Sequence, residues 1–241
     1  MNIAIIGYGK MGKEIEKTAL ERGHNIVCVI DNESDWETKN ELIVTADVAI
    51  EFSMPKVAPD NIKKCFDKDI PVVCGTTGWN EHENEIRERC LNDGKALFYA
   101  PNFSIGMNFM FMINKMLARF AQHYGYELSI RETHHIHKLD MPSGTAVKLA
   151  NDIIANNSNY SQWALDASKE GILPVISIRE GEVFGIHNVK AVSECDEINI
   201  SHQAFSRKGF AVGAVTAAEF LIGKKGLYNM NDLLNENINN N

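Results

Sequence analysis

The feature that most constrains the fold is a glycine-rich turn placed directly after the first apolar segment. Residues 3–6 read IAII, a continuously apolar run of the kind found in strands that are buried on both faces. This run leads into GYGKMG at 7–12, and the helix-favouring segment KEIEKTALER follows and stops at Gly23. A strand, a G-x-G-x-x-G turn and a helix in this order predict the start of a dinucleotide-binding sheet.

Strands and helices continue to alternate as far as residue 104. The helical segments lie at 55–66 and 80–90, and apolar segments typical of strands lie at 25–30, 46–53, 71–78 and 96–104. Since parallel strands need a crossover connection, usually a helix, this alternation predicts a parallel sheet.

The pattern changes after Ser104. A long apolar helix is expected at 105–125, with methionines that fill the core. Extended, β-branched segments then follow, separated mostly by turns, at 126–132, 174–180, 182–193 and 196–206. Short turns favour an antiparallel or mixed sheet. The fold class is therefore α/β, with an N-terminal Rossmann-type parallel sheet and a second α+β domain containing a mixed or antiparallel sheet.

The glycines of the turn each have a physical role in holding a dinucleotide. Gly7 permits the tight turn, Gly9 lets the backbone approach a pyrophosphate, and Gly12 lets the helix and strand pack closely. The helix that begins here offers free N–H groups and a partial positive charge to the phosphates. The expected cofactor-binding residues of the turn are Gly7, Tyr8, Gly9, Lys10, Met11 and Gly12.

Asp31 ends the second expected strand, where a carboxylate accepts hydrogen bonds from the adenine ribose. Its charge repels a 2′-phosphate and so favours NADH, whereas Lys10 can reach that phosphate and offset the repulsion. NADH, NADPH or both are therefore expected as cofactors. Two further loops follow strands at the edge of the sheet where ligands bind, and they are expected to line the nicotinamide pocket: Gly75, Thr76 and Thr77, and Ala100, Pro101, Asn102 and Phe103.

Charge and cysteine content exclude several classes of protein. A formal net charge of -8 argues against a nucleic-acid or membrane-surface partner, because either needs a basic face. The five cysteines are widely spaced without a C-x-x-C pair, which predicts buried, reduced thiols. The sequence shows neither an apolar run long enough to span a membrane nor a signal peptide. We expect a soluble, cytoplasmic protein.

Residues 131–146 read RETHHIHKLDMPSGTA and admit three interpretations: a metal site, a solvated loop, or a site of chemistry on an anion. The histidines lack the i, i+4 helical spacing of a metal site, so no metal is expected. The segment Ser143-Gly144-Thr145 precedes residues with helical apolar spacing. It is therefore either an anion cradle at a helix N-terminus or a simple helix cap.

Just upstream lie imidazoles and the ammonium of Lys138, which can bind a second carboxylate or supply a proton. A hydride donor in one half and a proton-donating, dicarboxylate-binding loop in the other predict a reductase of a C=N or conjugated C=C bond. Closure of the two domains is expected, since the two sites lie on different domains.

The residues resemble one family along nearly the whole chain. ETHHIHKLDMPSGTA is similar to the signature of the 4-hydroxy-tetrahydrodipicolinate reductase (dihydrodipicolinate reductase) family of lysine and diaminopimelate biosynthesis. The supporting motifs are GYGKMG, EFSMP at 51–55, CGTTGW at 74–79, APNFSIGMN at 100–108, REGEVFGIH at 179–187 and INISHQAFSRKGFAVGA at 198–214.

The resemblance implies roles for particular residues. His134 matches the family's catalytic histidine and Lys138 its proton-donating lysine, while His135 matches a substrate-contacting histidine. Gly144 and Thr145 match the residues that hold a substrate carboxylate. It also implies a dinucleotide-binding domain at 1–104, onto which residues 215–241 pack back. Residues 105–214 would form a substrate-binding and oligomerisation domain that builds a homotetramer.

The chain departs from the family at two positions. Ile136 stands where many members have a basic residue, and Asn32 stands where some carry an arginine for the 2′-phosphate. Two other functions stay open at this point: another two-domain NAD(P)-dependent enzyme such as an aspartate or homoserine dehydrogenase, and a nucleotide-sensing protein without catalysis. A nucleotide-sensing protein without catalysis would not need His134 or Lys138.

Overall fold

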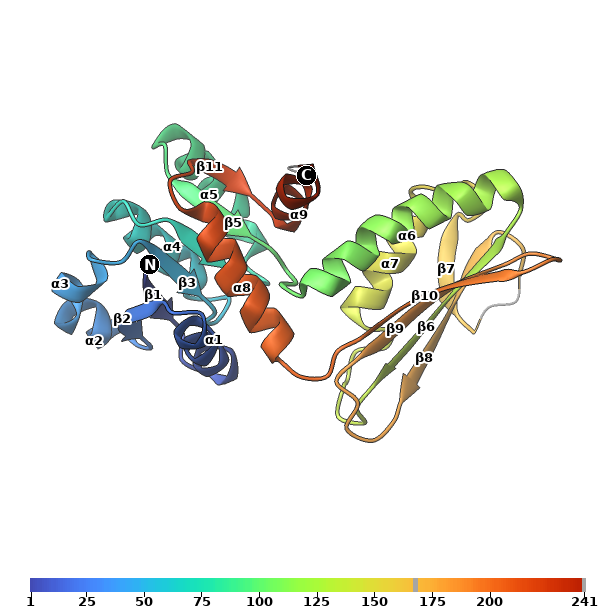
Figure 1. The fold of residues 1–241 in the computed structure, drawn as a ribbon, viewed down its shortest axis with the longest axis horizontal. Helices are drawn as coiled ribbons and strands as arrows, with labels where there is room; N and C mark the ends of the chain where they lie inside the picture. The colour runs from blue at the N-terminus through green and yellow to red at the C-terminus, as the bar shows by residue number, and fades with distance from the viewer. Residues whose placement is uncertain (167–168, 240–241) are drawn as a thin grey trace. The chain divides into compact units, whose positions relative to one another are not determined.

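Figure 1 shows the computed structural model, which describes residues 1–166 and 169–239. The chain divides into two compact units, one made of residues 1–105 and 207–241 and the other of residues 106–206. Residues 240 and 241, in the segment expected to return to the first domain, lie outside the described residues.

The first unit is built on a six-stranded sheet in the order β11-β5-β4-β3-β1-β2. All of its pairings are parallel, as the alternation of strands and helices predicts. The continuously apolar segments form the central strands, and every residue of β3 is buried. The strands are β1 (Asn2–Ile6), β2 (Asn25–Ile30), β3 (Val48–Glu51), β4 (Val72–Cys74), β5 (Ala96–Tyr99) and β11 (Gly226–Tyr228).

Helices cover both faces of this sheet. Helices α1 and α8 pack against each other, and α4 and α5 pack together as a second pair. The bounds of the helices are α1 (Lys10–Glu21), α2 (Glu33–Thr38), α3 (Asn40–Ile43), α4 (Ala58–Asp67), α5 (Asn80–Asn92), α8 (Lys208–Leu221) and α9 (Met230–Asn239).

Helix α8 belongs wholly to the first unit, although the sequence analysis assigned its residues up to 214 to the second domain. The reason is close packing. A side chain at Gly213 would place its first carbon 1.7 Å from the carbonyl oxygen of Phe103, so only glycine lets the helix lie against that loop. An ion pair of 2.6 Å between Arg22 and Glu219 also joins α8 to the end of α1.

The second unit is a five-stranded mixed sheet in the order β10-β9-β6-β8-β7. Strand β6 pairs parallel with β8 and antiparallel with β9, so the prediction of a mixed sheet is confirmed. The sequence analysis missed β7. The strands are β6 (Glu127–His134), β7 (Gln162–Leu165), β8 (Ile172–Arg179), β9 (Ile186–Val192) and β10 (Glu197–Gln203).

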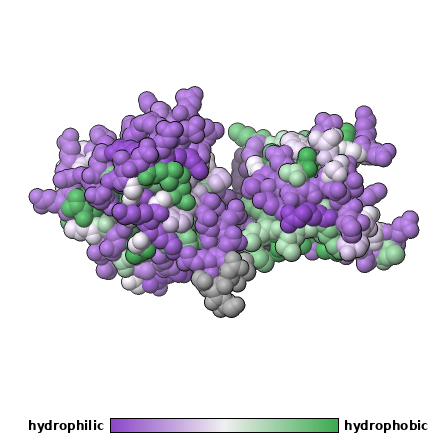
Figure 2. All heavy atoms as spheres, turned by 90° about the horizontal axis from the view of Figure 1, so that it is seen from above, coloured by the Kyte–Doolittle hydropathy of each residue, from purple (hydrophilic) through white to green (hydrophobic). Residues whose placement is uncertain are grey.

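Helices α6 (Ile105–Tyr124) and α7 (Gly144–Ile154) share one hydrophobic core with this sheet. Met107 and Met110 belong to that core, as expected from the methionine-rich helix. Figure 2 shows hydrophilic residues over most of the visible face of the first unit and a band of hydrophobic residues on the second. Within the described part of the chain, no helix has the length and apolar character that a membrane span needs.

The cysteines follow the predicted pattern with one exception. Cys28, Cys65, Cys74 and Cys90 are buried free thiols, and burial raises the pKa of Cys90 to about 11. Cys195 is exposed, so the expectation of burial was wrong there. It lies in the turn between β9 and β10, outside both cores.

Candidate functional site

The glycine turn has the geometry that a pyrophosphate-binding loop requires. Gly7 has a φ of +89°, and a side chain there would collide with the carbonyl oxygen of Phe52 at 2.3 Å. A side chain at Gly12 would lie 2.2 Å from the carbonyl oxygen of Gly7, so α1 can pack this closely only with glycine. Gly9 precedes the first residue of α1, and a Cβ there would meet nothing within 4 Å. The backbone of Gly9 is therefore open to a ligand.

Asp31 lies beside this turn. Its Oδ1 accepts a hydrogen bond of 2.7 Å from the backbone N–H of Tyr8, which brings the acid at the end of β2 to the glycine loop. Asn32 caps α2 by accepting from Asp35, and the Asp35 carboxylate accepts from the N–H groups of both Asp31 and Asn32. A hydrogen bond from Lys39 lowers the pKa of Asp35. The segment that follows β2 is thus anionic where it meets the glycine turn. Lys10 is exposed and Met11 is half-buried.

The ring of Phe52 connects the two other predicted loops. A Cβ on Gly75 would lie 2.2 Å from this ring, so the loop after β4 rests directly on it. The ring centroid of Phe103, after β5, lies 5.4 Å from that of Phe52. Residues 75 and 103 are therefore held together at the carboxyl ends of β4 and β5. Ala100 is buried, Asn102 is half-buried, and Pro101 is exposed.

Two hydrogen bonds fix the 75–77 loop at its middle residue, Thr76. Ser53 N–H donates to Thr76 Oγ1 at 2.9 Å, and the Trp79 indole donates to the Thr76 carbonyl at 2.6 Å. Thr77 is exposed next to this anchored residue. Beneath Ser53 lies Glu51, a fully buried acid that accepts from the Ser53 hydroxyl and from the Cys74 thiol at 3.2 Å. The sequence analysis missed the role of Glu51.

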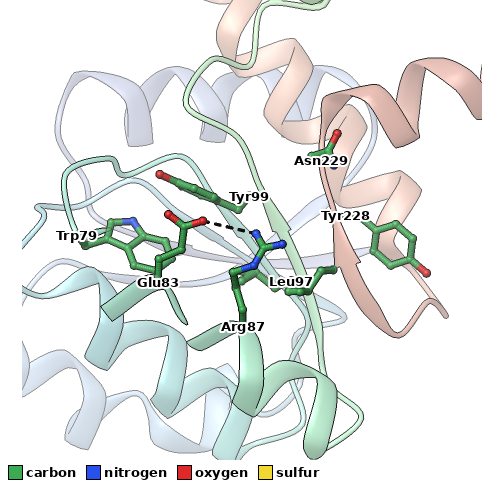
Figure 3. A pocket seen from close by; sticks show the side chains of 8 residues that line it. Trp79, Glu83, Arg87, Leu97, Tyr99, Tyr228 and Asn229 are labelled. Atoms are coloured by element: carbon green, nitrogen blue, oxygen red, sulfur yellow. Dashed lines mark hydrogen bonds and ion pairs between the residues drawn. The ribbon is translucent and has the colours of Figure 1, made fainter. Parts of the chain in front are cut away.

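Figure 3 shows a small cavity elsewhere in the first unit, between α5, β5 and β11. Its volume is about 70 Å³, and Trp79, Tyr99, Arg87 and Tyr228 contribute to its walls. Ligand pockets usually measure several hundred Å³, so this cavity has room for a few water molecules but not for a nicotinamide ring. None of the expected cofactor residues lines it.

In the second unit, His134 lies at the end of β6 and its ring is paired with Glu132. The two residues are two positions apart on one strand, so their side chains share a face, and both are buried. The Glu132 carboxylate contacts His134 Nδ1 through Oε2. Its Oε1 accepts from Arg179 at 2.9 Å and from the Ser143 N–H at 3.3 Å. Burial alone would raise the pKa of Glu132, but hydrogen bonds from His134 and Arg179 outweigh it and lower the pKa to about 2.

Arg179 extends this network to the loop that carries Lys138. It lies opposite His134 in the parallel register of β6 and β8. Its Nε donates to the Lys138 carbonyl at 3.3 Å, and its Nη2 donates to the Asp140 carbonyl at 2.5 Å. One planar guanidinium therefore holds both the buried carboxylate and the backbone of the 138–140 loop.

The Lys138 ammonium pairs with the Asp140 carboxylate at 2.8 Å. This hydrogen bond lowers the pKa of Asp140, and a backbone hydrogen bond from Gly144 adds to the effect. Ser143 caps α7 by accepting from the Ala146 N–H at 3.2 Å, so the simple cap predicted for this segment is present. A Cβ on Gly144 would meet nothing within 4 Å, which leaves the helix tip open to a ligand. Thr145, the second residue of α7, is half-buried.

His187 on β9 completes the buried cluster. Its ring centroid lies 5.0 Å from that of His134, and its Nε2 lies 3.2 Å from Ser143 Oγ. Burial, with the nearby His134, lowers the pKa of His187 to about 4 and keeps it neutral near pH 7. Glu132, His134 and His187 place ligand-type atoms within 4.8 Å of one another. Arg179 already neutralises Glu132, so a metal cation at this position would meet the repulsion of a guanidinium.

The other histidines of the motif are more exposed. The backbone N–H of His135 donates to Val183 at 2.8 Å, and its buried Nδ1 has no partner within the described chain. His137 faces Glu182 at 3.2 Å on the surface. Ile136, in place of the family's frequent basic residue, is 60% exposed.

The structure brings the predicted residues together in two groups. The glycine turn and Asp31 form one group in the first unit, next to the 75–77 and 100–103 loops. His134, Lys138 and the tip of α7 form the other group in the second unit. Sequence reasoning missed the partners Glu132, Arg179 and His187 as site residues. The available signal was the two-residue spacing of Glu132 and His134, although the expected strand ended at residue 132.

Comparisons with known proteins match both units. The family model described as dihydrodipicolinate reductase, N-terminus, matches residues 1–103, and the model for its C-terminus matches residues 106–234. A 4-hydroxy-tetrahydrodipicolinate reductase of Christiangramia forsetii is 45% identical over 237 residues, which are 98% of each chain.

Solved structures agree with these matches. A dipicolinate-bound dihydrodipicolinate reductase from Paenisporosarcina sp. TG-14 superposes with a TM-score of 0.78 at 25% identity, over 95% of this chain and 97% of that chain. An amine dehydrogenase from Mycobacterium smegmatis reaches a TM-score of 0.62 at 10% identity over 94% of each chain, a likeness of fold alone. Because both family models and a relative of near-full length agree, the chain belongs to the dihydrodipicolinate reductase family.

Proposed function

We propose that this chain reduces 4-hydroxy-tetrahydrodipicolinate to tetrahydrodipicolinate with NADH or NADPH, and that His134, Lys138 and the tip of α7 carry out the substrate chemistry. The reaction is that of its family in lysine and diaminopimelate biosynthesis, and the chain is an NAD(P)H-dependent oxidoreductase. The assignment of the individual residues is the proposed part.

The first unit would hold the nucleotide. The pyrophosphate would lie on the open backbone of Gly9 at the start of α1, where N–H groups and the helix dipole favour anions. Asp31 would accept hydrogen bonds from the adenine ribose, and residues 75–77 and 100–103 would line the nicotinamide pocket. When bound, the reduced nicotinamide supplies the hydride.

The second unit would hold the substrate. One carboxylate would bind at the open tip of α7 through Gly144 and Thr145, with His135 contacting the substrate. The C4–OH bond and a C5–H bond break with loss of water, which leaves a C4=C5 bond conjugated with the ring imine. Hydride adds to C4, the electrons of C4=C5 shift toward the imine, and a proton added at C5 restores the imine and completes the reduction. Lys138 is held with 24% of its side chain exposed, and with His134 it would deliver that proton.

One observation supports these roles most strongly: a buried, ionised Glu132 holds the ring of His134 close to the helix tip that would bind the carboxylate. Reduction of an imine-type bond needs a proton source beside the carboxylate anchor, and this geometry supplies one. A binding protein without catalysis would not need such a network.

The test uses purified protein with substrate generated by dihydrodipicolinate synthase and follows oxidation of each nucleotide by absorbance. Lys138→Ala should lower kcat by at least roughly 100-fold, as for loss of a general acid, while the Kd for NADH stays within about twofold. Unchanged turnover in Lys138→Ala would contradict the residue assignment. Wild-type turnover of aspartate semialdehyde or homoserine, with none of hydroxy-tetrahydrodipicolinate, would contradict the reaction.

We also propose a homotetramer that acts in the cytoplasm, where the soluble nucleotide is available. The sheet of the second unit supports an oligomer, because Ile176, Ile178 and Ile186 alternate with residues that face the core and are only half-buried in the single chain. Light scattering should give four times the mass of 27.0 kDa, and a monomer at micromolar concentration would contradict the proposal. The expected closure of the two domains stays a prediction.

A further inference from the structure

The pair Glu132–Arg179 contacts every segment of the second unit to which a substrate role is proposed. Glu132 is fully buried on β6, and 11% of the Arg179 side chain on β8 is exposed. Their ion pair has a length of 2.9 Å. Both residues are constrained, because the carboxylate and the guanidinium each make further hydrogen bonds to residues of the proposed site.

On one side of the pair, the Glu132 carboxylate binds both the His134 ring and the start of α7. Its Oε2 accepts from His134 Nδ1, which fixes the proton of a neutral ring on Nδ1 and leaves the lone pair on Nε2. Its Oε1 accepts from the Ser143 N–H at the start of α7. The proton-handling ring and the carboxylate-binding helix tip therefore share one acceptor.

On the other side, the guanidinium holds the loop of Lys138. Two of its nitrogens donate to the carbonyls of Lys138 and Asp140, while a third group donates to Glu132. A lysine at this position would keep the charge but not the fork of donors.

The edge of the His134 ring that carries Nε2 lies beside Gly185. Gly185 has a φ of +151°, and a Cβ on it would lie 2.9 Å from His134 Nε2. Glycine at 185 therefore keeps side-chain atoms away from the nitrogen that Glu132 leaves unprotonated. The charged or titratable groups around the pair of rings, His134 and His187, are Glu132, Arg179, Lys138 and His202.

From these contacts we propose that Glu132 and Arg179 are positioning residues for the reaction: the pair sets the tautomer of His134 and fixes His134, the Lys138 loop and the tip of α7 relative to one another. This inference rests on the proposed roles of His134 and Lys138. It adds two residues that touch neither substrate nor nucleotide in that proposal.

The first test is Glu132→Gln, which keeps the shape and removes the charge. We expect kcat to fall roughly 10- to 100-fold, as when an outer partner of a functional histidine is removed. The KM for NADH should stay within about twofold. Glu132→Asp should recover part of the loss.

The matched control is Asn114→Ala, which removes a buried hydrogen bond of 3.0 Å from α6 to the Leu149 carbonyl in the same unit. It should lower the melting temperature but leave kcat within about twofold of the wild-type value. Should Glu132→Gln fail to fold, Arg179→Lys decides: kcat should fall more than about tenfold while the KM for NADH stays within about twofold of the wild-type value.

A spectroscopic measurement separates this inference from the proposed function. In protein labelled with nitrogen-15 at histidine, the Nδ1–H of His134 should give a downfield proton signal that disappears in Glu132→Gln. If the wild type shows this signal but does not turn over hydroxy-tetrahydrodipicolinate, the proposed function fails and the pairing stands. If the wild type turns over and Glu132→Gln keeps its kcat, or if Glu132→Gln and Asn114→Ala lower kcat equally, the positioning role is overturned.

Discussion

The anionic segment after β2 predicts a preference for NADH over NADPH. A 2′-phosphate carries a charge of about -1.5 to -2 at pH 7. Asp31 is held beside the glycine loop by its 2.7 Å hydrogen bond from Tyr8, at the position where that phosphate would bind. At about 4 Å in water-like surroundings, each pair of unit charges costs about 1 kcal/mol. The repulsion is then about 1.5–2 kcal/mol, or about 10- to 30-fold in kcat/KM in favour of NADH.

Two nearby lysines do not cancel this repulsion, because each of them already pairs with another carboxylate. Lys39 pairs with Asp35 at 2.7 Å, and Lys64 pairs with Glu33 at 2.5 Å. Lys10 is the residue expected to offset the repulsion. Lys10→Ala should therefore raise the preference for NADH further, and an unchanged ratio would show that Lys10 does not reach the phosphate.

The decisive perturbation is Asn32→Arg, assayed as kcat/KM with each nucleotide at a fixed, low salt concentration. A guanidinium at 32 should bind the phosphate and move the ratio at least about tenfold toward NADPH. Because Asn32 also caps α2, its loss should cost about 1 kcal/mol of stability. Asn32→Ala measures that cost alone and should leave the ratio within about twofold. A wild type that prefers NADPH, or an equal shift in Asn32→Ala, would refute the reasoning.

Two further outcomes follow from the second unit. The folded pKa of His187, about 4, lies below the usual 6.5, so the unfolded chain binds more protons between these values and stability falls as pH drops from about 6.5 to about 4. This loss amounts to roughly 3 kcal/mol. Melting curves at pH 7 and pH 4.5 should differ less for His187→Gln than for the wild type, and an equal difference would contradict the assignment. Asp140 pairs with Lys138, the proposed proton donor, and accepts a hydrogen bond from the Gly144 N–H, which is proposed to bind a substrate carboxylate. Asp140→Asn should lower the KM for hydroxy-tetrahydrodipicolinate several-fold, whereas Asp152→Asn, on the opposite end of α7 beside Lys148, should not.

The sequence predicted those parts of the fold that depend on local pattern. The apolar runs ending at Gly7 and Asp31 became β1 and β2, and the segment from Ser143 became the capped start of α7. It could not predict β7 or β11, which are short and have little apolar periodicity. Their pairing depends on neighbours that are distant in the chain.

The same distinction applies to the site. His134 and Lys138 stand in one motif, so their proximity is local. Arg179 lies 47 residues from Glu132, and its contact exists only because β6 and β8 pair in parallel with His134 opposite Arg179. No pattern of residue spacing in the sequence predicts the register between these two strands. The sequence showed that Arg179 is charged, but it did not show that Arg179 pairs with Glu132.

Burial of Glu132 is difficult to explain by stability alone. Removing a carboxylate and a guanidinium from water costs several kcal/mol per ion, and a buried pair recovers this only with good geometry and additional hydrogen bonds. Glu132 and Arg179 have those bonds, but they are made to the His134 ring, to Ser143 and to the Lys138 loop rather than to the core. Glu51 in the first unit shows the same arrangement, since it is buried at the end of β3 and accepts from Ser53 beside the 75–77 loop. In each unit a buried acid near a strand's carboxyl end fixes loops of the proposed site, which a hydrophobic side chain of equal volume could not do.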